Sequence, residues 1–143
     1  MAIRPASADD LATVAELVAG AGLPVDGLGD QFPGGYAVAE GGAGLVGVAG
    51  MERHGDFGLL RSVAVAASHR GTGLGKALVA DRLLWARQAR LGAVYLLTTT
   101  AADFFAALGF ARTARAEAPA PIRASREFSV LCPGTSVLMR LPL

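Results

Sequence analysis

A glycine-rich stretch with charged flanks, His69 to Lys76, contains the residues of this chain best suited to binding an anion. Glycines at positions 71, 73 and 75 leave the backbone N–H groups open to close approach by a bulky ligand. Arg70 and Lys76 add full positive charges, and a helical pattern begins near Leu74, so the positive end of a helix dipole lies at the same place. These features predict a site for phosphate or pyrophosphate.

The spacing within this loop excludes two common phosphate-binding motifs. A P-loop, G-x-x-x-x-G-K-[ST], needs a first glycine where this chain has Arg70 and a metal-binding hydroxyl where it has Ala77. The dinucleotide fingerprint G-x-G-x-x-G needs a third glycine at the position of Lys76. What remains is the pattern R-x-x-G-x-G, which follows an apolar run over residues 59–66 and opens a helical pattern.

Hydrophobic periodicity predicts the elements that position this loop. Apolar or alternating runs predict strands at residues 3–5, 36–40, 45–51, 57–66, 93–98, from 110 onward and at 136–141. Helical spacing predicts helices from residue 11 to Gly20 and at 73–91, 101–108 and 119–131, with a short one at 25–32. Capping boxes at Ser7-x-x-Asp10 and Thr100-x-x-Asp103 mark two helix starts. Gly41-Gly42, the polar residues 52–56 and Pro133-Gly134 mark turns.

The order of these elements predicts the fold. Three hairpin-linked strands followed by a strand–helix–strand unit indicate an α/β fold, a mixed sheet with helices on its faces. With 143 residues, the chain is expected to form one domain spanning residues 1–143. The glycine-rich loop then lies at the carboxyl end of a strand, which is where open α/β sheets bind ligands.

Composition restricts the possible partners. A hydrophobic fraction of 52% with 17% charged residues is typical of a compact globular protein. A formal net charge of +1 predicts no binding to nucleic acid or to a membrane surface, and no apolar stretch or signal-peptide pattern predicts insertion. The single cysteine, Cys132, excludes an internal disulfide and favours a cytoplasmic location. His54 and His69 stand alone, so no metal site is predicted.

Two segments together resemble a known family. The loop resembles the acyl-CoA loop of the GCN5-related N-acetyltransferases (GNAT), whose pattern is Gln/Arg-x-x-Gly-x-Gly/Ala. Residues 102–110, ADFFAALGF, resemble the family's Phe-Tyr-x-x-x-Gly-Phe segment, and the order of elements is also that of the family, with 119–131 as an addition. Phe105 stands where many members carry a tyrosine that protonates the departing thiolate, so that acid is missing here. Phe104 is expected to be a core aromatic.

The resemblance implies acetyl-CoA as the co-substrate and no metal. It implies that strand residues 63–65 receive the pantetheine as an added strand, and that a backbone N–H near Val65 stabilises the oxyanion. The pyrophosphate is expected on the N–H groups from Arg70 to Lys76. The cofactor-binding residues implied in this way are Val63, Ala64, Val65, Arg70, Gly71, Thr72, Gly73, Leu74, Gly75, Lys76 and Phe105.

Direct attack by an amine on the thioester also requires a base and an acceptor site. Glu52 and His54 are the nearest candidates for the base, although a solvated hairpin accounts for both equally well. Arg61 interrupts an apolar strand beside the expected thioester site, which makes it a candidate for binding an acidic group of the acceptor. Further acceptor-binding candidates are Ser62, which reaches the same side only if a bulge intervenes, Thr98, Thr99 and Arg123.

Finer features resemble the arsenic-resistance (ArsN-type) N-acetyltransferases: LLRS at 59–62, YLLTTT at 95–100, and APAPIRAS at 118–125 with LCP at 131–133. Related enzymes acetylate the α-amino group of phosphinothricin-like amino acids and of arsinothricin. The sequence therefore favours an acetyltransferase for a small amino-acid-like amine, and the resemblance suggests a cytoplasmic homodimer. Acetylation of another small amine or a protein N-terminus, and a non-catalytic acyl-CoA sensor, remain as alternatives.

Overall fold

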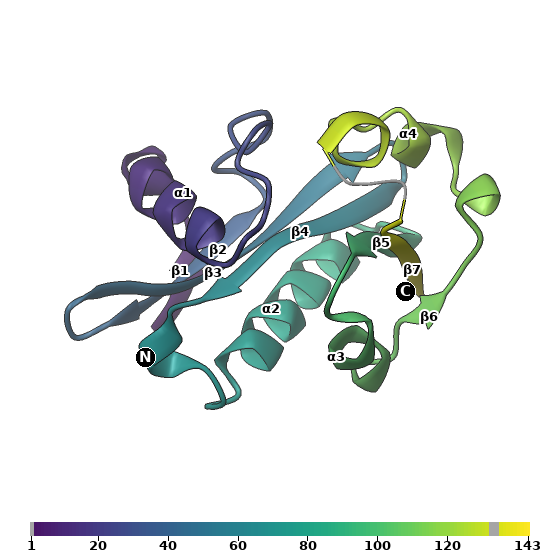
Figure 1. The fold of residues 1–143 in the computed structure, drawn as a ribbon. Coiled ribbons are helices and arrows are strands. Elements are labelled where there is room, and N and C mark those ends of the chain that lie inside the picture. Colours follow the sequence, from purple (N-terminus) through teal and green to yellow (C-terminus); the bar gives the residue numbers. More distant parts are fainter. Residues whose placement is uncertain (1, 132–134) are drawn as a thin grey trace.

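The computed structural model describes residues 2–131 and 135–143, and a seven-stranded sheet forms its centre (Figure 1). The strands are β1 (Ala2–Pro5), β2 (Tyr36–Gly41), β3 (Gly44–His54), β4 (Phe57–Val65), β5 (Ala93–Thr98), β6 (Ala111–Arg112) and β7 (Val137–Pro142). Their order in the sheet is β1-β2-β3-β4-β5-β7-β6. Neighbours are antiparallel except β4 and β5, which run parallel. The predicted mixed α/β fold is confirmed.

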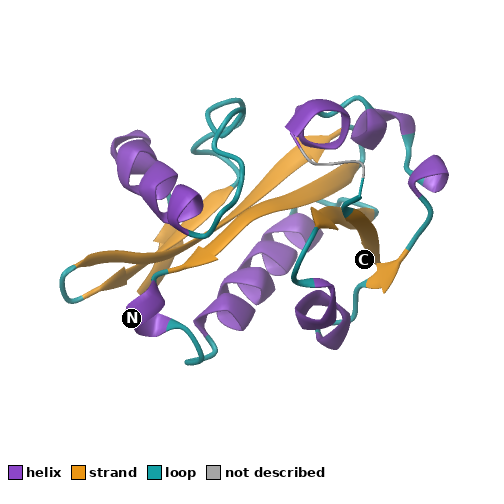
Figure 2. Cartoon of the chain, in the orientation of Figure 1, coloured by secondary structure: helices purple, strands orange, loops and turns teal. Residues whose placement is uncertain are grey.

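Helices cover both faces of this sheet (Figure 2). The α-helices are α1 (Leu11–Gly20), α2 (Leu74–Gln88), α3 (Ala102–Ala107) and α4 (Ala120–Arg123), and a π-helical turn, η4, spans Glu127–Leu131. Short 3-10 turns lie at η1 (Ala8–Asp10), η2 (Ala67–His69) and η3 (Arg115–Glu117). In the part of the chain that the structure describes, no helix is long and apolar enough to cross a membrane.

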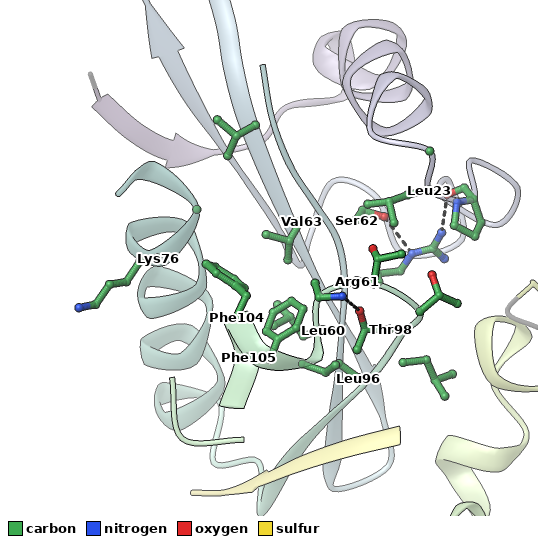
Figure 3. A pocket seen from close by; sticks show the side chains of 18 of the residues that line it. Leu23, Leu60, Arg61, Ser62, Val63, Lys76, Leu96, Thr98, Phe104 and Phe105 are labelled. Atoms are coloured by element: carbon green, nitrogen blue, oxygen red, sulfur yellow. Dashed lines mark hydrogen bonds between the residues drawn. The ribbon is translucent and has the colours of Figure 1, made fainter. Parts of the chain in front are cut away.

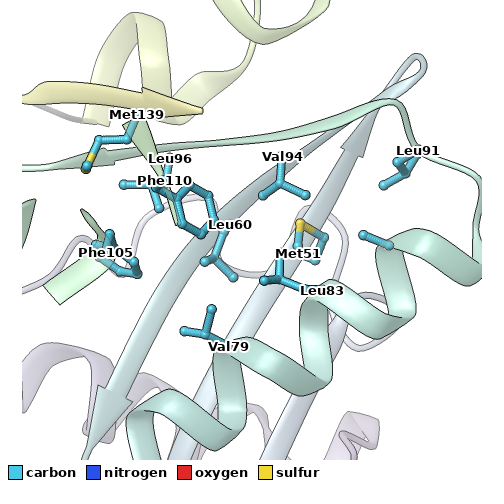
Figure 4. Close-up of a cluster of buried hydrophobic side chains, with 11 residues drawn as sticks. Met51, Leu60, Val79, Leu83, Leu91, Val94, Leu96, Phe105, Phe110 and Met139 are labelled. Carbon is cyan, nitrogen blue, oxygen red and sulfur yellow. The ribbon is translucent and has the colours of Figure 1, made fainter. Parts of the chain in front are cut away.

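Successive side chains of β4 point to opposite faces of the sheet, and their contacts show which helix packs on which face. Leu60 joins α2 and α3 in the largest apolar cluster, which contains Met51, Val79, Leu83, Val94, Leu96, Phe105, Phe110 and Met139 (Figure 4). The preceding residue, Leu59, packs against Ile122 of α4 on the opposite face. Val14 and Val18 of α1 pack on that opposite face too, against Val48 and Ala64. The parallel β4–β5 pair is therefore covered from both sides, as parallel strands require.

Three local predictions, at residues 25–32, at 52–56 and at the start of α3, are corrected by the structure. The 25–32 segment forms turns and not a helix, because glycines at 27 and 29 disfavour helix and Gly27 has φ +78°. Residues 52–54 belong to β3, which pairs in register to its end, so the second turn is only Gly55-Asp56. Thr98 Oγ1, not Thr100, accepts the Ala101 N–H at the start of α3.

The predicted helix at 119–131 divides into α4 and η4. Ser125 lies between them with its side chain buried, and its Oγ donates to the Ile122 carbonyl at 2.6 Å and accepts the Phe128 N–H at 3.3 Å. A hydroxyl that bonds locally to the backbone competes with the helical ladder, which explains the interruption. Cys132 and the predicted turn at Pro133-Gly134 lie outside the described residues.

The capping box of Ser7 and Asp10 at η1, just before α1, should make the stability depend on pH. Asp10 accepts the Ser7 N–H and two guanidinium N–H groups of Arg4, at 2.8 to 3.1 Å. The hydrogen bonds from Arg4 and then from Ser7 lower the pKa of Asp10 to about 2. A lowered carboxyl pKa stabilises the fold above the ordinary value near 4, and this contribution is lost as the pH falls through about 2. Asp10→Asn is expected to lower the melting temperature at pH 7 by roughly 2–4 °C.

The control for this prediction is Asp9→Asn, which removes the same charge from the exposed neighbouring residue. Melting curves for both variants between pH 7 and pH 2 test the assignment. The Asp10→Asn deficit should disappear near pH 2, and the Asp9→Asn curve should follow the unmodified protein. An Asp10→Asn deficit that persists unchanged at pH 2 would contradict it.

Candidate active site

A cavity of about 1000 Å³ opens where β4 and β5 separate. The two strands pair only over Phe57–Leu59 and Ala93–Tyr95, and beyond this short ladder they diverge. Leu60 and Val63 of β4 line one wall, and Leu96 to Thr98 of β5 line the other (Figure 3). The backbone of β4 past Leu60 pairs with β3 on one side and faces the cavity on the other. An extended ligand can therefore add to this open strand edge.

A β-bulge in β4 shapes the wall of this cavity. Arg61 pairs with Gly50 and Ala64 with Val48, so Ser62 and Val63 together face Ala49. Ser62 has φ +58°, a conformation that costs a non-glycine residue about 1–3 kcal/mol and concentrates at functional sites. The bulge brings Ser62 beside Arg61, with Arg61 Nε donating to Ser62 Oγ at 3.1 Å. The bulge on which the candidacy of Ser62 depended is therefore present.

The glycine-rich loop lines the outer end of the cavity. Gly71 and Gly73 have φ +79° and +84°, and Gly73 is the N-cap of α2. A side-chain carbon built on either would meet no atom within 4 Å, so the space beside the backbone is open. Helix geometry leaves the N–H groups of the first turn of α2 without helical partners. Arg70 Nε holds the loop to β4 by donating to the Val65 carbonyl at 3.1 Å.

Most of the residues expected to bind the cofactor meet along this cavity. Those that line it are Val63, Val65, Arg70, Gly71, Gly73, Leu74, Gly75, Lys76 and Phe105. Ala64 does not line it, because its methyl packs on the α1 face of the sheet. Thr72 does not line it either; its hydroxyl donates to the His69 carbonyl at 2.6 Å.

Two phenylalanines of α3 also line the cavity. Phe105 is 7% exposed and packs edge-on against Phe104 and Phe110, with ring centroids 5.0 and 5.9 Å apart. Phe104 is 39% exposed, which corrects the prediction that it is a core residue. Both rings line the cavity and supply no acid.

No tyrosine replaces the missing acid in the described residues, because Tyr36 and Tyr95 do not line the cavity. Burial raises the pKa of Tyr36 to about 12, and its hydroxyl has no hydrogen-bond partner in that part of the chain. Ser62 is near enough to oppose this pKa shift, but the two hydroxyls do not reach hydrogen-bond geometry.

Arg61 lies at the inner end of the cavity, with 1% of its side chain exposed (Figure 3). Besides Ser62, its guanidinium donates to Glu52 Oε2 at 3.1 Å and to the carbonyls of Pro24 and Asp26, both at 3.4 Å. These contacts use four of the five N–H groups of an arginine. The two carbonyl bonds are long and therefore weak, so an acidic ligand could displace them.

Three charged or polarisable groups surround this guanidinium. Burial alone would lower the pKa of Arg61, but the negative charges of Glu127, Tyr36 when ionised, and Glu52 outweigh that effect and raise it. Glu127 is 5% exposed and also lines the cavity. Arg61 is therefore held as a cation by carboxylates on two sides.

Glu52 and His54 do not line the cavity. Glu52 is 3% exposed and lies between Arg61 and His54. Its Oε2 accepts a hydrogen bond from Arg61, and its Oε1 lies 2.9 Å from His54 Nε2. Burial raises the pKa of Glu52, but the hydrogen bond with His54 and the charge of Arg61 lower it further, and the net shift is downward. Glu52 is thus an anion that fixes Arg61, and it is not placed to take a proton from a ligand in the cavity.

The remaining candidates divide into two groups. Thr98 and Thr99 line the cavity, although Thr98 Oγ1 already accepts the Ala101 N–H at 3.0 Å. Arg123 is exposed on α4 and does not line it. No cluster of metal-ligating side chains occurs within residues 2–131 and 135–143.

Sequence reasoning missed two polar residues of the inner end, Glu127 and Ser136, which are buried and line the cavity. The one signal for Glu127 is an acidic residue directly before the apolar run FSVL. The segment that carries it is joined to the 22–35 loop by an exposed ion pair between Arg126 and Asp30, at 3.3 Å.

Comparisons with known proteins agree with this geometry. The protein-family model for the acetyltransferase (GNAT) domain matches residues 33–112. Rv2747 from Mycobacterium tuberculosis, solved in complex with CoA and NLQ, is 25% identical and has a TM-score of 0.83, over 100% of this chain and 99% of its own. N-acetylglutamate synthase from Neisseria gonorrhoeae, complexed with coenzyme A and N-acetyl-glutamate, is 22% identical with a TM-score of 0.84, over 99% of this chain but 35% of its own.

A GNAT-family acetyltransferase from Staphylococcus aureus Mu50 is 14% identical with a TM-score of 0.81, over 99% of this chain and 98% of its own. No curated protein sequence matches the chain. The identities are low, so the last two structures support the fold alone.

Proposed function

The chain belongs to the GNAT acetyltransferase family, and from this premise we propose that it acetylates the α-amino group of a small amino acid with a second acidic group. Acetyl-CoA is the co-substrate and the enzyme is an acetyltransferase. We propose that the acceptor is of the phosphinothricin or arsinothricin type, as in the ArsN-type enzymes. One observation carries this proposal: the cavity runs from the glycine-rich loop to a buried arginine, Arg61.

The described residues fit acetyl-CoA along this path. The open space beside Gly71 and Gly73 suits a pyrophosphate, and Arg70 and Lys76 supply charge beside it. The free edge of β4 suits the two amides of pantetheine, because a strand edge offers both donors and acceptors. A thioester placed near Val65 would then face the inner end of the cavity, where the acceptor must bind. The N–H groups of the bulged strand are the donors we propose for the oxyanion.

An acidic acceptor is consistent with Arg61. Within the described residues, the guanidinium keeps one N–H beyond these four contacts, and it can exchange two weak carbonyl contacts for a carboxylate or phosphinate. Glutamate and phosphinothricin share a side-chain acid two methylenes from the α-carbon. The bound N-acetyl-glutamate of the Neisseria enzyme gives a reason to test glutamate beside phosphinothricin.

A second candidate is a small amine without a further acidic group. Asp26 and Glu127 both line the inner end of the cavity, and Glu52 already neutralises Arg61. Two carboxylates beside one neutralised cation favour an ammonium group over a second anion. The alternatives of a protein N-terminus and a non-catalytic sensor lack an observation of this kind.

Release of free thiol from acetyl-CoA in the presence of single amines distinguishes these functions. Phosphinothricin, arsinothricin and L-glutamate represent acidic acceptors, and L-alanine and spermidine represent acceptors without a second acid. The proposal expects kcat/KM to be at least about tenfold higher for one acidic acceptor than for L-alanine, which corresponds to one ionic hydrogen bond. A preference for L-alanine or spermidine would support the second candidate. CoA binding without turnover of any amine would instead favour the sensor.

We also propose that residues 1–143 act as one domain, in the cytoplasm and as a homodimer. The single cysteine supports a reducing compartment, and the resemblance to the ArsN-type enzymes supports the dimer. Light scattering on the purified chain measures the dimer directly, and a monomer mass at micromolar concentration would contradict it.

A further inference from the structure

The acceptor end of the cavity contains a carboxylate that is better placed than Glu52 to meet an amine. Glu127 lines the cavity and is 5% exposed, whereas Glu52 and His54 do not line it. Asp26 lines the same end but is exposed on the 22–35 loop. Of the carboxylates that line the cavity in the described residues, Glu127 is therefore the buried one. Its charge acts strongly on neighbouring groups, because the effective dielectric constant is lower inside a protein than in water.

The surroundings of Glu127 explain why a carboxylate is tolerated there. Arg61 of β4 lines the same end of the cavity, and the negative charge of Glu127 raises the pKa of its guanidinium. Tyr36 of β2 also senses its charge. Glu52 balances Arg61 from the other side through a 3.1 Å hydrogen bond. Two carboxylates, Glu127 and Glu52, thus lie near the single guanidinium of Arg61 at this end.

We infer that Glu127 binds the ammonium group of the acceptor and takes the proton that the amine must lose before it attacks. This inference rests on the proposed acetyl transfer and names the base for it. An amino acid would then lie between two opposite charges, with its acidic group toward Arg61 and its ammonium group toward Glu127. The base then comes from the C-terminal segment after β6, and not from the end of β3, which carries the candidates Glu52 and His54.

The step balances without a further reagent. One ammonium proton moves to a Glu127 carboxylate oxygen, which leaves a lone pair on nitrogen. That lone pair forms the bond to the thioester carbonyl carbon, and the carbon–sulfur bond breaks with its electrons on sulfur. The second proton released by the nitrogen neutralises the CoA thiolate. This also supplies the proton that the tyrosine missing at Phe105 would have donated.

Glu127→Gln tests the inference in the full-length enzyme, because the amide keeps the shape but accepts no proton. With phosphinothricin or L-glutamate, whichever the unmodified enzyme acetylates, kcat should fall about 100-fold or more while CoA affinity by calorimetry changes less than twofold. The acidic limb of the pH profile of kcat should disappear as well. Asp26, Glu52, His54, Arg61 and Tyr36 face or adjoin this end and remain unchanged in the variant.

Chemical rescue distinguishes a base from a structural group. Glu127→Ala leaves space for formate, and added formate should restore turnover at least about tenfold if a carboxylate is needed as the base. Glu117→Gln is the matched control, an exposed glutamate in the same C-terminal segment that should keep full activity.

Three results would overturn the inference: kcat for Glu127→Gln within twofold of the unmodified enzyme, loss of CoA binding together with turnover, or no response of Glu127→Ala to formate. Failure of the unmodified enzyme to acetylate any acidic acceptor is a separate result, since it bears on the proposed function. If L-alanine or spermidine is turned over instead, the same variants are compared on that amine.

Discussion

Gly73→Val is expected to weaken CoA binding about 100-fold or more while the protein stays folded. Gly73 has φ +84° and ψ +5° at the N-cap of α2, in the left-handed region. A β-branched residue held there costs about 1–3 kcal/mol, and the loop relieves this strain by turning its peptide groups. That rotation directs N–H donors away from the pyrophosphate. Two lost charge-assisted hydrogen bonds, at about 1.5–3 kcal/mol each, account for the loss of affinity.

A steric clash with the rest of the protein is not the cause of the expected loss of CoA affinity. A side-chain carbon at Gly73 would meet no protein atom within 4 Å, so the apo fold has room for valine. The damage is expected only when the loop must bind phosphate. The control is Gly42→Val in the β2–β3 turn, where a side chain also meets nothing within 4 Å and no left-handed φ is required. Calorimetric titration with CoA and a melting curve for each variant provide the measurement. An unchanged CoA affinity in Gly73→Val would remove the loop from the cofactor site.

The sequence was sufficient for the loop and the frame that holds it. Glycine spacing, flanking charge and the start of α2 are local properties, and local properties are readable from sequence. The mixed sheet followed from hairpin turns and from a helical pattern between two apolar runs, where the structure has a helix of 15 residues. The bulge at Ser62 entered only as a condition for that residue to reach the site, because nothing in the local sequence LLRSVAV requires it.

The acceptor end could not be predicted in the same way, because distant segments assemble it. Glu127 reaches the cavity only after the chain has passed through β6 and α4, and its position depends on Ser125 interrupting a helix. The polar run ERHGD left two interpretations of Glu52 open, a base near the thioester or a residue of a solvated hairpin. The structure buries Glu52, since Arg61, two residues further along the adjacent strand than the register partner Leu59, supplies the partner that a buried carboxylate needs. The sequence of one strand does not indicate which side chain of the neighbouring strand will lie against it.

Arg61→Met alone is expected to destabilise the fold by about 3–5 kcal/mol and to abolish turnover. Arg61 and Glu52 form a buried pair, with 1% and 4% of their side chains exposed, and their Nη1 and Oε2 atoms lie 3.1 Å apart. Removing the arginine leaves Glu52 buried with His54 but without the guanidinium, which is the costly way to break such a pair. Glu52 has a lowered pKa, so its contribution to stability is present above its ordinary pKa and is lost as the pH falls through the folded value.

The double variant Arg61→Met with Glu52→Leu separates structure from substrate binding. Apolar residues of similar size can replace a buried ion pair at little cost or even with a gain, so urea unfolding should recover most of the lost stability. The acid-dependent loss of stability that comes from Glu52 should also disappear. Turnover of an acidic acceptor should stay at least about tenfold below that of the unmodified enzyme, because no cation remains to bind the acid. Recovery of full kcat/KM in the double variant would mean that Arg61 serves the fold alone, and the acceptor's acidic group would then have to bind elsewhere.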